Sequence, residues 1–353
     1  EVTFLKNALD KVGVGVDGVQ ISPYKTMSNQ FTKETITPEQ QEQMDWLLDD
    51  LFDQITAEMA NGRSLSQTQL HDLMNQVPLT AEAALAAGLV DDIAYQDDLA
   101  CLLADQPEES EAAGADPDPE AASADAELDQ DSAENPPQKP EANLVDWPKA
   151  GRLLTEKARY SSRQFIGVIS LEGLINMGSS QSPPIDIPIP LVGGQVAGEQ
   201  TLVYLLRQAE KLDEMAGLIL HVDSPGGSAL ASDLIGREVQ RLSQKKPVLA
   251  YMGNTAASGG YYVSAYANHI MSQSLTITGS IGVVGIRLHT QGLYNKIGVN
   301  RIGLDRGSKT NFYTDMNPLT PEELETWHAN IVHSYEQFKQ VVAEGRKLPY
   351  DEL

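Results

Sequence analysis

Short β-rich runs alternate with helix-like stretches through residues 144–353, and this alternation limits the possible fold more than any other feature. Residues 217–223 are almost entirely apolar, as expected of a strand buried on both faces of a parallel sheet. Residues 165–171 form a similar run, and residues 199–212 between them have helical spacing. Such an order is typical of parallel strands joined by crossover helices. The sequence therefore predicts an α/β fold.

Further runs continue the same pattern towards the end of the chain. A helix is predicted over residues 229–242, and strands over residues 247–252, 281–286 and 299–304.

The beginning of the chain resembles its end. Three short matches share an offset of about 285 residues: residues 11–14 with 296–299, 24–26 with 308–310, and 37–39 with 320–322. Long amphipathic helices are predicted after both copies, over residues 40–59 and 323–342. Thr37 and Thr320, each followed by Pro and Glu, are suited to cap them. A steady offset indicates tandem duplication of one unit.

The duplication defines three parts of the chain. Residues 1–103 would be the C-terminal part of a first repeat, and residues 144–353 a second repeat truncated at its C-terminus. Residues 104–143 between them are rich in Asp, Glu, Ala and Pro, and Lys139 is their only basic residue. We expect a disordered acidic linker, since such a composition buries too little apolar surface to order itself. Much of the net charge of −25 lies there, and no basic stripe remains elsewhere, which argues against nucleic-acid binding.

The single cysteine, Cys101, excludes an intrachain disulfide and a cysteine-based metal cluster. We expect it to be a small buried hydrophobe, and we expect neither a metal nor a cofactor. No run reaches the ~18 apolar residues of a membrane span, and no signal peptide is present. The chain starts at Glu1 in the middle of a pattern, so we interpret it as a fragment.

Two glycine-rich turns are candidates for an active site. Residues 223–228 (DSPGGS) end an apolar strand and open a helix, so their backbone N–H groups could form an oxyanion hole. Residues 256–262 (AASGGYY) place Ser258 among small residues, where a substrate carbonyl could approach closely. Each turn alone could equally be a tight strand–helix connection. Their occurrence together, about thirty residues apart, favours catalysis with Ser258 as nucleophile.

A catalytic serine needs a base, and the histidines are poor candidates. A structural role explains each of the following histidines better: His221, His269, His289, His328 and His333. Among them His289 is the least implausible base. A lysine is the other option, because burial can lower its pKa. A shift from ~10.4 to ~7.5 needs about 4 kcal/mol, which a desolvated cleft can supply.

Three motifs together resemble signal peptide peptidase A, the serine peptidase family also called protease IV. They are DSPGG, AASGGYYVSA and the run LTITGSIGV at residues 275–283. Residues 24–32 and 47–52 resemble the lysine-bearing region of that family's first repeat. The resemblance is to the long, duplicated form. It implies a ClpP/crotonase-like fold of repeated β-β-α units and a Ser–Lys dyad whose lysine and serine lie in different repeats.

The resemblance assigns roles to individual residues. It makes Ser258 the nucleophile and Lys25 its general base, with the N–H groups of Gly227 and Gly259 binding the oxyanion. Gly226 would shape the turn, and Ser280 would orient the lysine amine or be only a turn hydroxyl. ClpP-type peptidases carry a base histidine some 25 residues after the serine, whereas this chain has residues 281–284 (IGVV) there.

A second lysine leaves the identity of the base open. Lys309 occupies the matching place in the second repeat, shortly after Asp305 and Arg306. It could serve a serine of the first repeat, be a surface residue, or be the base of Ser258. We favour Lys25, because its surroundings match the lysine-bearing motif better.

The family resemblance also implies a substrate, an assembly and a location. The substrates would be remnant signal peptides or misfolded membrane-associated peptides, cut at small or apolar side chains. Four chains would form a ring, with helices such as residues 46–52 between subunits. The protein would associate with the inner (cytoplasmic) membrane through a segment upstream of Glu1. Two alternatives are a crotonase-type acyl-CoA enzyme, although no basic patch for the CoA phosphates is evident, and a non-catalytic scaffold.

Overall fold

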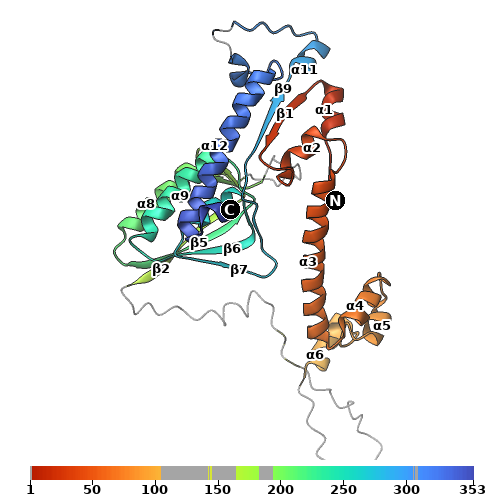
Figure 1. The fold of residues 1–353 in the computed structure, drawn as a ribbon. Helices are drawn as coiled ribbons and strands as arrows, with labels where there is room; N and C mark the ends of the chain where they lie inside the picture. Colours follow the sequence, from red (N-terminus) through yellow and green to blue (C-terminus); the bar gives the residue numbers. More distant parts are fainter. Residues whose placement is uncertain are drawn as a thin grey trace, which may run out of the picture. The chain divides into compact units, whose positions relative to one another are not determined.

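This computed structural model describes residues 2–104, 142, 144, 164–182, 194–304, 306 and 309–353 (Figure 1). Apart from Ala104 and Ala142, the predicted acidic linker over residues 104–143 lies outside the described residues. The chain divides into two compact units. The first comprises Glu1–Ile55 and Ser161–Leu353, and the second comprises Thr56–Tyr160. The N-terminal segment with Lys25 therefore belongs to the same unit as the segment with Ser258.

A parallel sheet forms the centre of the first unit. Its strands are β2 (Phe165–Glu172), β5 (Met215–Ser224), β6 (Val248–Ala257), β7 (His269–Ser272) and β8 (Ile277–Gly279). The strand order is β2-β5-β6-β7, and β8 pairs with the end of β6. All these pairs are parallel, and helices connect β2 to β5 and β5 to β6. The α/β fold class is confirmed, since parallel neighbours require crossover connections.

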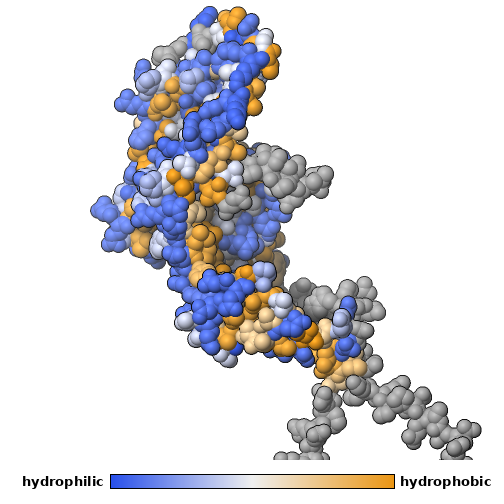
Figure 2. Space-filling view, turned by 90° about the vertical axis from the view of Figure 1, so that its right-hand side faces the viewer, coloured by the Kyte–Doolittle hydropathy of each residue, from blue (hydrophilic) through white to orange (hydrophobic). Residues whose placement is uncertain are grey.

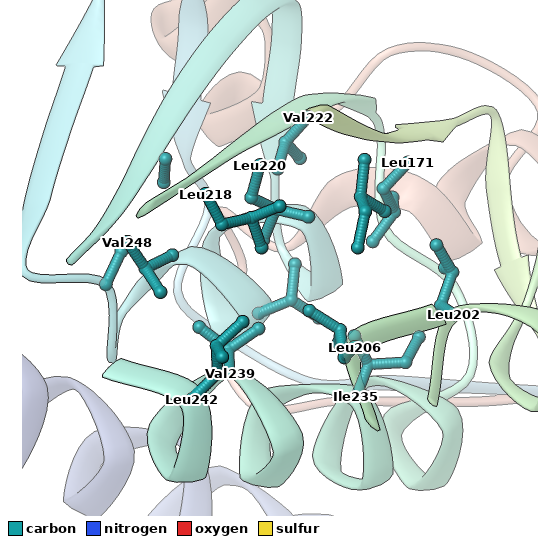
Figure 3. Close-up of a cluster of buried hydrophobic side chains, with 14 of the residues drawn as sticks. Leu171, Leu202, Leu206, Leu218, Leu220, Val222, Ile235, Val239, Leu242 and Val248 are labelled. Atoms are coloured by element: carbon teal, nitrogen blue, oxygen red, sulfur yellow. The ribbon is translucent and has the colours of Figure 1, made fainter. Parts of the chain in front are cut away.

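Helices α8 (Glu199–Lys211) and α9 (Ala229–Ser243) supply the other half of the main core. Figure 3 shows their apolar side chains facing those of the sheet. Leu220 and Val222 of β5 are fully buried, as are Ile235 and Val239 of α9. Burying one such side chain stabilises the fold by about 1.5–3 kcal/mol. The ends of β5 and β6, where the two glycine-rich turns begin, are thus held by a rigid layer.

A separate two-stranded ribbon joins the N-terminal segment to the chain that follows the parallel sheet. Strand β1 (Gly15–Gln20) pairs antiparallel with β9 (Val284–His289), and the two lie side by side in Figure 1. Helix α1 (Lys6–Val12) precedes β1, and α11 (Gln291–Lys296) follows β9. The strand predicted over residues 281–286 is present but begins three residues later. The strand predicted over residues 299–304 is wrong, because these residues pair with no other strand of the described chain.

The two long helices after the repeated motifs are of equal length. Helix α3 (Pro38–Arg63) and helix α12 (Pro321–Arg346) each have 26 residues. Thr320 caps α12, accepting from the N–H of Glu323 at 3.2 Å, and Thr37 accepts from the N–H of Gln40 at 3.3 Å. Both caps follow the prediction.

Short elements complete the first unit. They are α2 (Asn29–Thr32), α10 (Gly259–Ser264), the parallel strands β3 (Leu174–Asn176) and β4 (Val196–Gly198), and the 3-10 helices η1 (Thr26–Ser28), η3 (Thr310–Tyr313) and η4 (Tyr350–Glu352).

The second unit is helical where the structure describes it. After the end of α3 it contains α4 (Gln67–Met74), α5 (Ala81–Ala86), the 3-10 helix η2 (Gln96–Asp98) and α6 (Leu99–Leu102). Leu70 is buried, and Arg63 pairs with Asp91 at 2.6 Å. Cys101 is partly exposed, so its predicted burial is wrong; it lies near the end of a four-residue helix with no buried residue. No helix of the described chain is long and apolar enough to span a membrane.

Candidate active site

Ser258 lies between the end of β6 and the start of α10. Its backbone has φ +52° and ψ −117°, a conformation that is unfavourable for a residue with a side chain. Two hydrogen bonds hold it: its N–H donates to the carbonyl of Gly279 (2.9 Å), and its carbonyl accepts from the N–H of Tyr262 (2.9 Å). The strained turn directs the side chain away from the regular course of the strand.

Lys25 reaches this serine from a distant part of the sequence. It follows β1, and its N–H donates to the carbonyl of Ser22 at 3.0 Å in a tight turn before η1. Its Nζ lies 3.2 Å from Oγ of Ser258, although the two residues are 233 positions apart. The same Nζ donates to the carbonyl oxygen of Ser280 at 2.7 Å and to Oγ of Ser280 at 2.9 Å.

These three contacts define what the amine can do. A neutral amine has two N–H donors and one lone pair. If the two donors are used on the oxygens of Ser280, the lone pair is left to accept the hydroxyl proton of Ser258. Ser280 has φ +49° and follows Gly279 with φ +76°, so a strained turn presents both its oxygens to the amine.

Burial lowers the pKa of Lys25 to about 8, from its usual value near 10.5. Desolvation is the cause, because the low-dielectric surroundings disfavour the ammonium form. The aliphatic part of the side chain passes over Gly282, where a β-carbon would lie 3.4 Å from Cδ of Lys25. Near pH 8 about half of the molecules would therefore carry a lysine able to accept a proton.

The turn after β5 packs directly against the serine turn. Gly226 (φ +101°) and Gly227 (φ +153°) both have backbone conformations that favour glycine. A β-carbon on Gly226 would lie 2.9 Å from Cβ of Ser258, and one on Gly227 would overlap with the carbonyl of Ile175. Within the described chain, the N–H groups of Gly227 and Gly259 donate to no other group. Both remain available to a ligand beside Ser258.

Two residues of the first turn have a supporting role that the sequence did not reveal. The buried hydroxyl of Ser224 donates to the carbonyl of Gly173 at 2.6 Å and accepts from the N–H of Gly226 at 3.1 Å. Asp223 accepts from the N–H of Thr255 at 3.1 Å, which ties the end of β5 to β6. The available signal was their position, directly before Pro-Gly-Gly at the end of a buried strand.

Lys309 is engaged elsewhere. Its Nζ donates to Oγ1 of Thr326 at 2.7 Å and lies 3.7 Å from a carboxylate oxygen of Glu322. Like Lys25, it directly precedes a 3-10 helix, in agreement with the repeat. Among the histidines, His221 lies 3.6 Å from Glu172, and the ring of His289 covers Gly15. The structure thus brings Lys25 to Ser258, with Ser280 and the two glycine turns, and places Lys309 against α12.

A family model and several curated proteases match this chain. The model of peptidase family S49 matches residues 1–108 and 240–353, the stretches that contain the repeated motifs. The chloroplastic serine protease SPPA of Arabidopsis thaliana is 30% identical over 100% of this chain and 47% of its own length. Protease 4 of Haemophilus influenzae is 26% identical over 99% of this chain and 52% of its own length. The chain thus spans about half the length of these curated relatives.

Among solved structures, ClpP1 from Listeria monocytogenes matches 52% of this chain and 75% of its own chain, at 14% identity and a TM-score of 0.27. That likeness is too distant to place individual residues.

Proposed function

The chain belongs to peptidase family S49, and we propose that it hydrolyses peptide bonds with Ser258 as nucleophile and Lys25 as general base. The observation that carries this proposal is the 3.2 Å contact between Nζ of Lys25 and Oγ of Ser258, made in a site that lowers the pKa of the lysine to about 8. A nucleophile within hydrogen-bond reach of a base that a third group orients is the arrangement needed for covalent catalysis. Ser280 is that third group here.

The reaction follows from this geometry. Neutral Lys25 takes the hydroxyl proton while Oγ of Ser258 attacks the scissile carbonyl carbon. The N–H groups of Gly227 and Gly259 donate to the oxyanion of the tetrahedral intermediate. Lys25 then returns the proton to the leaving amine, which leaves an acyl group on Ser258. Water, deprotonated by Lys25, hydrolyses the ester and restores the serine.

An active-site-directed fluorophosphonate separates this proposal from its alternatives, because it phosphonylates activated serines. We expect labelling of the wild type, and loss of labelling in Ser258→Ala and in Lys25→Ala. Lys309→Ala is the matched control and should label like the wild type, since Lys309 contacts Thr326 and Glu322. Labelling that survives Lys25→Ala but not Lys309→Ala would transfer the base to Lys309. Absence of labelling in a folded wild type would favour a scaffold.

Remnant signal peptides are the substrates that we propose, together with misfolded membrane-associated peptides cut at small or apolar residues. A relative from Enterococcus faecium, 34% identical over 40% of this chain, bears the name putative signal peptide peptidase SppA. Cleavage of a synthetic signal peptide by the wild type and not by Ser258→Ala would support this. Equal cleavage of a charged, polar peptide would argue against the expected preference. The location at the inner membrane is proposed on the same family grounds, and fractionation of cells would test it.

We further propose assembly into a ring of four chains, supported by the way the repeats contact each other. Strand β1 of the first repeat pairs with β9 of the second, and Gly13 at the end of α1 packs against Gly292 of α11. In the repeat alignment α1 corresponds to α11, whereas β1 corresponds to residues 300–305 and not to β9. In the ribbon, therefore, different surfaces of the two repeats meet, beside the contact of the corresponding helices α1 and α11. Contacts of this head-to-tail kind generate rings when they close.

Several apolar positions are exposed in one repeat although the aligned positions of the other repeat are buried. Leu304 is 87% exposed, whereas Val19 at the matching position in β1 is 8% exposed. Leu48 and Ile55 of α3 are exposed, whereas Ile331 and Phe338 at the matching positions of α12 are buried. In Figure 2, which faces the side of the molecule that carries α3, hydrophobic residues reach the surface. These apolar positions are the expected subunit contacts. Light scattering should give four times the mass of one chain for the wild type and a smaller mass for Leu304→Glu; a monomeric wild type would contradict the ring.

A further inference from the structure

The β1–β9 ribbon brings the segment that carries Lys25 alongside the segment that leads to Ser280. The two strands are antiparallel, so the chain that runs forward from β1 to Lys25 lies beside the chain that runs backward from β9 to Ser280. Ile21 continues the pairing, donating its N–H to the carbonyl of Val283 at 3.2 Å. The register of this ribbon therefore sets the position of Lys25 along the second repeat.

Within the ribbon itself, few side-chain pairs mark that register, although the ring of His289 covers Gly15. A ribbon of only two strands is marginally stable, and glycine-rich strands slip easily because few side chains mark the pairing. This ribbon contains Gly15, Gly18 and Gly285. A slip of one residue would move β1 by about 3.4 Å and reverse its faces. Such a shift exceeds the 3.2 Å contact between Nζ of Lys25 and Oγ of Ser258.

One ion pair crosses the ribbon at its centre. Asp17 stands directly opposite Arg287, and Oδ2 of Asp17 accepts from Nη1 of Arg287 at 2.7 Å. The two side chains are 10% and 13% exposed. Nη1 also donates to the carbonyl of Asn317 at 2.9 Å, and Nη2 donates to the carbonyls of Asn311 (2.7 Å) and Thr314. Asp17 in turn accepts from the N–H of Leu319 at 3.1 Å. The pair therefore satisfies its charges and locks β1 to both β9 and the loop before α12.

We propose that Asp17 and Arg287 are a positioning pair, which fixes the register of β1 against β9 and so holds Lys25 within reach of Ser258. This inference rests on the proposed roles of those two residues. Specifying register is the best-attested use of a buried ionic group, since a shifted pairing would leave the buried carboxylate of Asp17 without its charged partner.

The second repeat provides an internal comparison. Gly13 and Gly18 align with Gly298 and Gly303, so the position of Asp17 is occupied there by Ile302. Ile302 is 85% exposed, and its segment forms no strand within the described chain. The position aligned with Asp17 thus carries a carboxylate in the copy whose lysine contacts Ser258 and an isoleucine in the copy whose lysine contacts Thr326. This difference links Asp17 to the placement of the lysine.

The test is Asp17→Asn, which keeps the shape of the side chain and an acceptor for Leu319 but removes the charge. We expect the fluorophosphonate labelling rate at pH 8 to fall by about 100-fold, as for a misplaced catalytic group. The pH at which labelling reaches half of its maximum should also rise, because a displaced Lys25 becomes hydrated. Asp91→Asn is the matched control, since Asp91 accepts from Arg63 at 2.6 Å in the second unit. It should label like the wild type.

A crosslink distinguishes positioning from a merely structural role. Val16 and Leu288 stand opposite each other in the ribbon, at a spacing that suits a disulfide. Val16→Cys with Leu288→Cys, oxidised in the Asp17→Asn background, should restore both the rate and the pH midpoint, and reduction should abolish the rescue. Wild-type labelling of Asp17→Asn would overturn the inference, as would a slower rate with an unchanged midpoint and no rescue. If instead Lys25→Ala labels normally, it is the proposed dyad that fails.

Discussion

Gly226 packs so closely against Gly259 that a β-carbon on Gly226 would lie 2.6 Å from the backbone nitrogen of Gly259. The two glycine-rich turns, about thirty residues apart in the sequence, thus meet without any intervening side chain. We predict that Gly226→Ala separates them and lowers the fluorophosphonate labelling rate by at least about 100-fold, because misplaced oxyanion donors cost roughly 3–4 kcal/mol. Gly88→Ala is a control for a glycine of positive φ with open space around it. Its labelling should be unchanged, and normal labelling of Gly226→Ala would contradict the packing argument.

The labelling rate should depend on pH through Lys25. Only the neutral amine accepts the proton of Ser258, and burial lowers the pKa of Lys25 to about 8. The rate is therefore expected to rise with pH and to reach half of its maximum near pH 8. Rates between pH 6 and 10, measured with a probe that does not titrate in this range, provide the check. A midpoint near 10.5 would show that the lysine is hydrated in solution.

Removal of Lys25 should stabilise the fold at neutral pH. Between pH 8 and 10.5 the unfolded chain binds more protons at this lysine than the folded chain, so its contribution to stability rises with pH over that window. Below pH 8 the burial of Lys25 lowers the free energy of unfolding by its full amount, about 3 kcal/mol. Lys25→Met should thus raise the unfolding free energy by up to about 3 kcal/mol at pH 7, and the gain should vanish above pH 10.5. Lys309→Met, at a position with 41% of its side chain exposed, should change the unfolding free energy by less than about 0.5 kcal/mol. Denaturant titrations of both variants at pH 7 and above pH 10.5 provide the measurement.

Ser280 should affect the rate more than the fold. Ser280→Ala removes one of the two oxygens that accept from Nζ of Lys25 and keeps the backbone carbonyl at 2.7 Å. We expect a loss of about 5-fold in the labelling rate, since one neutral hydrogen bond contributes about 1 kcal/mol. Ser280→Thr retains the hydroxyl but adds β-branching at a residue with φ +49°. Its labelling rate should therefore lie between those of Ser280→Ala and the wild type. Labelling of Ser280→Ala at the wild-type rate would leave Ser280 as a turn hydroxyl alone.

By itself the sequence predicted the parallel sheet and the two glycine-rich turns, and it indicated a repeat. Each of these is written in local patterns: a continuous apolar run for β5, the glycines that allow positive φ at Gly226 and Gly227, and a Thr-Pro-Glu cap before each long helix. Such patterns act over a few residues, so they can be read without knowing what lies next to them. The fold class and Ser258 as a candidate followed from them.

The tertiary structure alone decided which lysine lies beside that serine. Lys25 and Lys309 both precede a 3-10 helix in matching sequence, so the local pattern favoured Lys25 without excluding Lys309. Their difference arises from pairing across the chain: β1 finds β9 and the Asp17–Arg287 ion pair, whereas residues 299–304 have no strand partner in the described chain. The burial that lowers the pKa of Lys25 is a consequence of the same pairing. Contacts between segments more than two hundred residues apart depend on register and packing, which no short stretch of sequence encodes.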